Sequence, residues 1–199
     1  MRKTVFIVSH LGSGYENLLS SLLENSRIIL VSNCSYNYYR NLLDIINVPC
    51  NLKYKNKATY SLDCLLHNHM FSARDSYKDC KFIYLIDEPK YVLPKLYEIN
   101  QHPNINNMKS YYLYRLRRIC EMAKRTENAV FLTRKDLSNP MSYEIIENYL
   151  NLKEKLEIVR KNDDYLNTDS IPQSVLDETE MAYEKYLYYL KLQKLIFAK

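Results

Sequence analysis

Residues 4–23 of the 199-residue chain read TVFIVSHLGSGYENLLSSLL, and this stretch decides the fold. Its opening run, Thr4–Val8, is β-branched or apolar throughout, which is typical of a strand buried on both faces in a parallel sheet. A short turn with Gly12 and Gly14 follows. Tyr15–Leu23 then places leucines at i, i+1, i+4 and i+5, the spacing of a helix with one apolar face. The stretch therefore predicts a strand, a glycine-containing turn and a helix.

The two glycines of this turn are the only glycines in the chain, whereas an average protein contains roughly 7% glycine. All-β sandwiches and barrels need glycine at many turns and bulges, so the composition excludes them. It excludes collagen-like and flexible-linker proteins for the same reason. Because glycine is so rare here, Gly12 and Gly14 are the first residues to examine for a function.

Further apolar runs alternate with helical patterns along the rest of the chain. Strands are predicted at 27–32, 62–66, 81–86 and 129–133, and helices at 36–46, 91–99, 109–125, 141–150 and 172–199. Residues 156–159 fit a strand or a loop equally well. No internal repeat or linker divides the sequence. We expect one domain over 1–199, an α/β fold with three layers (α/β/α) and a mostly parallel central sheet.

Charge and apolar patterning limit the partners and the compartment. The formal net charge of +5 suits a phosphorylated ligand, or simply a soluble lysine-rich surface, and is too small to predict nucleic-acid binding. No apolar run reaches the roughly 18 residues that span a bilayer, and the N-terminal run is too short for a signal peptide. We expect a cytoplasmic protein without a membrane span.

The five cysteines are widely spaced and include no CxxC pair. Disulfide frameworks and zinc sites both favour paired or closely spaced cysteines, so neither is predicted, and no metal site is expected. The cysteines are interpreted as small core residues.

The turn after the first strand is the best candidate site. A strand, a Gly-Ser-Gly turn and a helix N-terminus together present backbone N–H groups under a positive helix dipole, which suits a phosphate or sulfate. The segment lacks the GxxxxGK[ST] pattern, and Asn17 stands where GxGxxG has its last glycine. We predict anion binding by Gly12, Ser13, Gly14, Tyr15 and Asn17; the alternative is a tight turn with a structural role only.

Four segments, taken in order, resemble the sulfotransferase family that uses 3′-phosphoadenylyl sulfate (PAPS) as donor. They are VSHLGSGYENL (8–18), KFIYLIDEPKYVL (81–93), YYLYRLRRICEMAKR (111–125) and AVFLTRKDLSNPMSYEIIENYLNL (129–152). The first is similar to the family's 5′-phosphosulfate loop, with Ser13 and Gly14 on its Ser-Gly. The resemblance implies a P-loop nucleoside triphosphate hydrolase-like fold. It also implies sulfuryl transfer from PAPS to a hydroxyl or amine of a small-molecule or glycan acceptor.

The resemblance also assigns a base. CLLHNH (64–69) looks like the family's strand end with the catalytic histidine, which places His69 on the base and His67 on the family's lysine. Neutral imidazole is a competent base near neutral pH, so His69 suits removal of the acceptor proton. Glu16, at the start of the first helix, is the alternative base. Ordinary strand-end histidines bonded to backbone would explain His67 and His69 equally well.

Several positions differ from the family's pattern. Gly12 stands where the loop has lysine or arginine, and Asp87 stands where an arginine binds the 3′-phosphate. Lys90 remains at the second basic position and is predicted to contact this phosphate. Arginines of neighbouring elements are further candidates, or else a solvated helix face: Arg115, Arg117, Arg118 and Arg134.

Two other functions stay open on sequence grounds. A non-catalytic protein of the same fold that binds a nucleotide, glycan or protein partner is favoured by Asp87 and Glu16. A P-loop kinase of small molecules is disfavoured because the first loop has no lysine for the β- and γ-phosphates.

Overall fold

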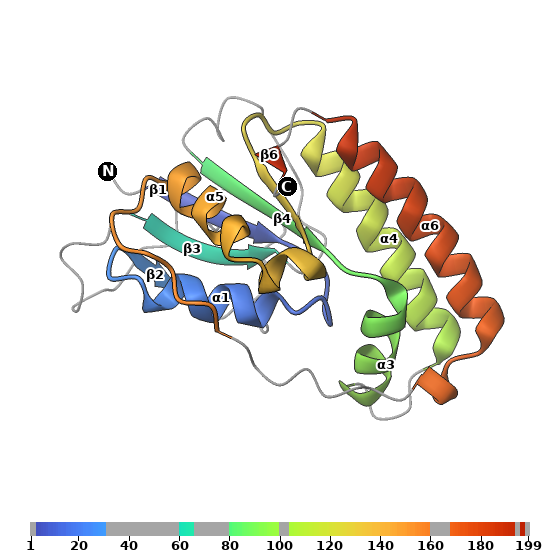
Figure 1. Ribbon diagram of the computed structural model, residues 1–199. Helices are drawn as coiled ribbons and strands as arrows, with labels where there is room; N and C mark the ends of the chain where they lie inside the picture. Colours follow the sequence, from blue (N-terminus) through green and yellow to red (C-terminus); the bar gives the residue numbers. More distant parts are fainter. Residues whose placement is uncertain are drawn as a thin grey trace.

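A six-stranded parallel sheet forms the centre of the protein, with strand order β2-β3-β1-β4-β5-β6 (Figure 1). The computed structural model describes residues 3–30, 60–65, 80–99, 104–159, 168–193 and 196–197. The strands are β1 (Lys3–Val8), β2 (Ile28–Leu30), β3 (Tyr60–Leu65), β4 (Cys80–Ile86), β5 (Val130–Thr133) and β6 (Ile196–Phe197). The predicted α/β fold with a parallel sheet is confirmed.

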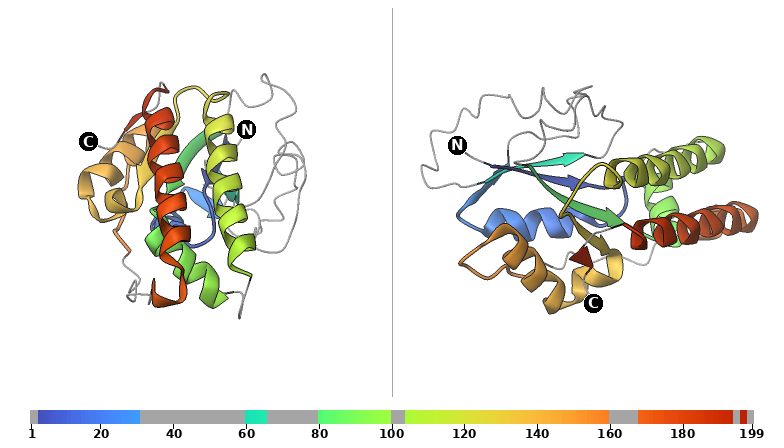
Figure 2. Two further views of the ribbon diagram at one scale, coloured as in Figure 1. Left: turned by 90° about the vertical axis from the view of Figure 1, so that its right-hand side faces the viewer. Right: turned by 90° about the horizontal axis from the view of Figure 1, so that it is seen from above.

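The helices are α1 (Tyr15–Glu24), α3 (Pro89–Ile99), α4 (Ile105–Ala123), α5 (Pro140–Leu150) and α6 (Gln173–Lys191), with 3-10 turns η2 (Arg134–Ser138) and η3 (Thr168–Ser170). The alternation of side chains along the strands explains the layers. In β1, Val5 and Ile7 pack in one apolar cluster with α1 and α5, while Phe6 and Val8 pack in a second with α3, α4 and α6. Helices α4 and α6 lie side by side (Figure 2).

The strand order positions the site. β1 lies between β3 and β4, with Phe6 level with Phe82 of β4. The chain leaves β1 toward β2 on one side, and leaves β4 toward β5 on the other. Adjacent parallel strands whose connections diverge mark the switch point where α/β proteins bind ligands, beyond the strands' carboxyl ends. The segments after β1 and β4 meet at this point.

Local capping explains several helix ends. Asn139 accepts a hydrogen bond from Met141 N–H at 3.1 Å, and Pro140 occupies the first turn of α5. α4 begins earlier than predicted, at Ile105 rather than 109, because Asn104 caps it through Asn106 N–H at 2.9 Å.

The C-terminal part differs most from the prediction. Of the two alternatives left open for residues 156–159, the loop agrees with the structure, which has neither strand nor helix there. α6 ends at Lys191 instead of continuing to the C-terminus, and β6 then pairs with β5. The helix predicted at 36–46 lies outside the described residues. No helix in the described ranges is both long and apolar enough to cross a membrane.

Candidate functional site

The segment Ser9–Gly14 leaves β1 and turns into α1 with two residues in left-handed backbone conformation. Gly12 has φ +83° and Gly14 has φ +76°, values that favour glycine. A Cβ on Gly12 would lie 3.2 Å from the carbonyl oxygen of Val92 in α3, whereas a Cβ on Gly14 would meet only Leu137 Cδ1, at 3.6 Å. Gly12 therefore allows close packing of the loop on α3, and Gly14 serves the turn itself.

Gly14 is also the N-cap of α1, and it supplies no side-chain acceptor for the first turn. Within the described part of the chain, the backbone N–H groups of Gly14, Tyr15 and Glu16 donate no hydrogen bond. Ser13 N–H approaches the His10 carbonyl at 3.4 Å, and Asn17 N–H donates to the Gly14 carbonyl at 3.1 Å. Three adjacent N–H donors at a helix N-terminus form an arrangement that suits an anion.

The Ser13 side chain points into the protein. Ser9 Oγ donates to the Leu85 carbonyl at 2.8 Å, and the Ser9 and Ser13 hydroxyls lie 2.6 Å apart. Because Ser9 has a single hydroxyl proton, Ser13 donates to Ser9. Both residues are fully buried. The hydroxyl of Ser13 therefore faces Ser9 and its N–H faces the His10 carbonyl, so neither group is open at the loop surface.

His10 joins the segments after β1 and β4. Asp87 N–H donates to His10 Nε2 at 3.2 Å, so the proton lies on Nδ1, which faces the Leu11 carbonyl at 3.3 Å. Burial, followed by the charge of Arg115, lowers the pKa of His10 to about 3 despite the Leu11 contact. His10 is therefore a neutral structural link at neutral pH.

Arg115 of α4 packs beneath the loop after β1. The sequence predicts a solvated or ligand-facing side chain for Arg115, and this prediction is wrong. Its exposure is only 1%, and Nη2 donates to the Ser9 carbonyl at 2.5 Å. Burial lowers the pKa of Arg115 to about 10, so it stays charged at neutral pH. Arg117 is exposed and Arg118 is half-buried, and both pair with Glu121.

The periodicity of α4 carried a signal for this burial. Residue 115 shares one helix face with Tyr112, Leu116 and Ile119, all of which are fully buried. Tyr112 also donates its hydroxyl to the Asp87 carbonyl at 2.7 Å, and Tyr111 accepts the Leu11 N–H at 3.0 Å. Helix α4 therefore forms hydrogen bonds to both the loop after β1 and the loop after β4.

The segments after β4 and β5 bring together three cations and two carboxylates. Arg134 Nη1 lies 2.8 Å from Asp87 Oδ2, and Glu88 N–H donates to Asp87 Oδ1 at 2.8 Å. The Arg134 guanidinium also lies over the Tyr91 ring, 4.6 Å from its centroid. Burial raises the pKa of Asp87 to about 7, although Arg134 and the Glu88 N–H lower it.

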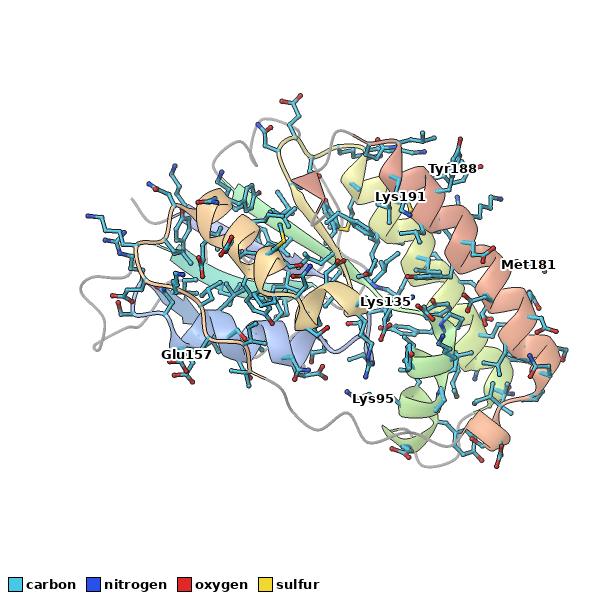
Figure 3. All side chains as sticks on the ribbon, in the orientation of Figure 1. Lys95, Lys135, Glu157, Met181, Tyr188 and Lys191 are labelled. Carbon is cyan, nitrogen blue, oxygen red and sulfur yellow. The ribbon has the colours of Figure 1, made fainter. Side chains whose placement is uncertain are left out.

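Glu88 holds the other two cations. Lys90 Nζ lies 2.5 Å from Glu88 Oε2, and Lys135 Nζ lies 2.9 Å from Oε1. Burial opposes ionisation of Glu88, but the two ammonium groups outweigh it and lower the pKa of Glu88. The Lys90 side chain is 50% exposed and that of Lys135 79% exposed; Figure 3 labels Lys135 near the start of η2. The cluster carries a formal charge of +1, from three cations and two anions.

The other predicted residues of the first helix lie beside the open N–H groups. Glu16 Oε2 is buried, and within the described ranges it accepts no hydrogen bond. Burial, followed by the Glu16 charge, raises the pKa of Tyr15, so its hydroxyl stays protonated. His67 and His69 lie outside the described residues, and the role predicted for His69 stays a prediction. No group of three or more His, Cys, Asp or Glu that would hold a metal ion occurs in the described part of the chain.

No protein-family model matches the chain, and no curated protein sequence matches it significantly. Among solved structures, the chain is similar to the crystal structure of mouse sulfotransferase SULT7A1 complexed with PAP. The TM-score is 0.58 at 12% identity, and the match covers 96% of this chain and 85% of that chain. At this identity the similarity shows a sulfotransferase-like fold.

Proposed function

We propose that this protein binds PAPS, and its product adenosine 3′,5′-bisphosphate (PAP), through the loop after β1, and transfers the sulfuryl group to a hydroxyl or amine acceptor. One observation carries the proposal. The N–H groups of Gly14, Tyr15 and Glu16 face no acceptor in the described chain, at the end of the central strand of a sulfotransferase-like fold.

The loop fits the phosphosulfate end of this ligand. A helix N-terminus with three available N–H donors favours an anion through both hydrogen bonding and the helix dipole. The family's loop cation is missing at Gly12, but Arg115 places a buried positive charge directly beneath the same loop. We infer that Arg115 stands in for the missing cation, acting through the loop rather than by contact.

The charged cluster after β4 and β5 can bind the 3′-phosphate only if its cations leave their carboxylate partners. Lys90, Arg134 and Lys135 are suitable cations, but each is paired with Asp87 or Glu88. A phosphate there must compete with two carboxylates, and ion pairs at partly exposed sites are individually weak, typically about 0–1 kcal/mol. The Glu88 pairs are the ones that yield, because Lys90 and Lys135 are exposed while Asp87 is buried.

Catalysis needs a base near the open N–H groups. Bound PAPS supplies the sulfuryl group, whose sulfur bonds to the acceptor oxygen or nitrogen as its bond to the phosphate oxygen breaks. His69, or alternatively Glu16, takes the acceptor proton. The N–H groups of the first turn of α1 stabilise the charge that develops on the departing phosphate.

A second function has a specific observation in its favour. Asp87 pairs with Arg134, and Glu88 pairs with Lys90 and Lys135, so each of these cations already has a carboxylate partner within the protein. This is what we expect of a protein that keeps the fold but does not bind PAPS as a sulfuryl donor. Such a protein would bind a nucleotide, glycan or protein partner without catalysis.

Calorimetric titration with PAP, with ATP as a second ligand, tests the binding claim. We expect micromolar affinity for PAP and weaker binding of ATP. Gly14→Asp should abolish PAP binding because it places a carboxylate at the open N–H groups. Gly14→Asn is the matched control, since asparagine tolerates the left-handed conformation without adding charge. No binding of PAP up to millimolar concentration would refute the cofactor assignment.

Transfer from labelled PAPS to a panel of hydroxyl and amine acceptors separates catalysis from binding. His69→Ala should abolish turnover while PAP affinity persists, and Glu16→Gln should do so if Glu16 is the base. If PAP binds but neither substitution alters turnover, both assignments are wrong. If PAP binds but the protein neither transfers the sulfuryl group nor hydrolyses PAPS slowly, the non-catalytic function is supported.

A further inference from the structure

The Glu88 carboxylate bridges two ammonium groups that come from different segments of the chain. Lys90, in the first turn of α3, lies against its Oε2, and Lys135, in η2, lies against its Oε1. Only 13% of the Glu88 side chain is exposed, so this carboxylate is the inner member of the group and the lysines cover it. Carboxylates and phosphates accept the same charge-assisted hydrogen bonds from ammonium groups. Glu88 therefore takes the position that an anionic ligand of the two lysines would take.

The backbone of Glu88 is held independently of its side chain. Its N–H donates to Asp87 Oδ1 at 2.8 Å, and its carbonyl accepts the N–H groups of Tyr91 and Val92 at 3.1 and 3.2 Å. These bonds fix the start of α3, whereas the carboxylate is joined to it only through rotatable side-chain bonds. The carboxylate can thus leave the lysines without a change in the backbone, and a substitution that keeps the side-chain length should leave the turn intact.

The other carboxylates of this region hold neither lysine. Asp87 is buried and pairs with Arg134. Glu180 of α6 lies near enough for its charge to matter: burial, followed by the charge of Glu88, raises the pKa of Glu180, and Lys90 opposes this shift. Glu180 forms no ion pair with any residue that the structure describes. Glu88 is therefore the carboxylate that competes directly with a phosphate for the two ammonium groups.

We propose that Glu88 is an internal competitor of the 3′-phosphate and that it weakens the preference of the protein for 3′-phosphorylated nucleotides. This inference rests on the PAP binding proposed above. A phosphate monoester carries a charge of about −1.5 to −2 at neutral pH, more than one carboxylate, so PAP can displace Glu88 from Lys90 and Lys135. Adenosine 5′-monophosphate (AMP) has no 3′-phosphate and leaves Glu88 in place. The displacement therefore weakens the binding of PAP but not that of AMP.

Calorimetric titration of wild type and Glu88→Gln with PAP and with AMP tests this competition, with far-UV circular dichroism to confirm folding. Glutamine keeps the shape of glutamate but carries no charge. PAP should bind to Glu88→Gln about 3–10-fold more tightly than to wild type, the size expected when two partly exposed ion pairs no longer compete. The affinity for AMP should stay within about twofold of wild type.

Two further variants separate displacement from a general effect of charge. Glu180→Gln is the matched control, because it removes a nearby negative charge without releasing either lysine, and it should change PAP affinity by less than about twofold. Lys135→Met alters an exposed side chain that contributes little to folding. It should weaken the binding of PAP and leave that of AMP unchanged.

The outcomes distinguish this inference from the proposed function. If wild type binds PAP and Glu88→Gln shifts PAP and AMP equally, or shifts neither, Glu88 is not a competitor and the proposed function still stands. A gain in Glu180→Gln as large as that in Glu88→Gln, or unchanged PAP binding by Lys135→Met, would also overturn the inference. If neither wild type nor Glu88→Gln binds PAP up to millimolar concentration, the proposed function fails and the inference fails with it.

Discussion

The two loop glycines should differ sharply when each is replaced by alanine. Both sit at positive φ, where a residue with a Cβ costs roughly 1–2 kcal/mol. At Gly14 that backbone term is nearly the whole cost, because the new Cβ meets only Leu137 Cδ1 at 3.6 Å. At Gly12 the Cβ also comes to 3.2 Å from the Val92 carbonyl oxygen, a backbone atom that moves only with α3.

The magnitudes follow from these contacts. We expect Gly14→Ala to lower the free energy of unfolding by about 1–2 kcal/mol. Overpacking adds roughly 1–3 kcal/mol, so Gly12→Ala should cost about 2–5 kcal/mol. For a chain of this size, about 1 kcal/mol shifts Tm by roughly 2–4 °C. Gly14→Ala should therefore melt about 2–8 °C below wild type, and Gly12→Ala roughly 4–20 °C below.

Urea denaturation followed by circular dichroism and tyrosine fluorescence measures both losses; the chain has 20 tyrosines and no tryptophan to obscure them. Gly14→Asn is the internal control, and it should lose less than Gly14→Ala because asparagine adopts the left-handed region more readily. Equal losses at the two positions, or a larger loss at Gly14, would refute the assignment of Gly12 to packing on α3.

Two further predictions concern the buried charges. Between about pH 6.5 and 4, His10 stays neutral in the folded protein because its pKa is about 3, whereas the same histidine is protonated in the unfolded chain; this difference lowers stability as the pH falls. Asp87 acts in the opposite direction. Its pKa of about 7 means that it takes up a proton in the folded protein before it does so in the unfolded chain, which raises stability as the pH falls. Asp87→Asn removes the stabilising effect of Asp87. Urea denaturation at a series of pH values should therefore show that the variant loses stability more steeply than wild type as the pH falls, by up to about 1.4 kcal/mol per pH unit. Equal slopes of stability against pH for the two proteins would contradict this. Arg115→Met should destabilise the protein by about 2 kcal/mol, because the Ser9 carbonyl loses a charge-assisted hydrogen bond. It should also weaken PAP binding severalfold more than Arg115→Lys, which keeps the positive charge. Equal PAP affinities for the two folded variants would exclude an electrostatic role of Arg115.

Local sequence patterns predicted the elements that build the site. The apolar run of β1, the two glycines and the leucine spacing of α1 are each local signals, and all three features occur where the residues indicated. The Asn139 cap of α5 was also predictable, because an asparagine before a proline that opens an apolar period is a local signature.

Tertiary partners were not predictable in the same way. Arg134 and Asp87 are 47 residues apart, and only the adjacency of β4 and β5 brings them together. The charge of Arg115 predicts a solvated or ligand-facing side chain, although its helix position favours the core. Burial of a charge depends on a specific acceptor, here the Ser9 carbonyl, which no local pattern encodes. The pairing of β6 with β5 likewise depends on the sheet edge rather than on the apolar C-terminal residues.

The most direct test of the central claim is the affinity of the wild-type protein for PAP, measured by calorimetry beside Gly14→Asp and Gly14→Asn. We predict micromolar binding of PAP that survives in Gly14→Asn within a few fold and vanishes in Gly14→Asp. No binding of PAP to the wild type up to millimolar concentration, or equal binding by all three proteins, would contradict it.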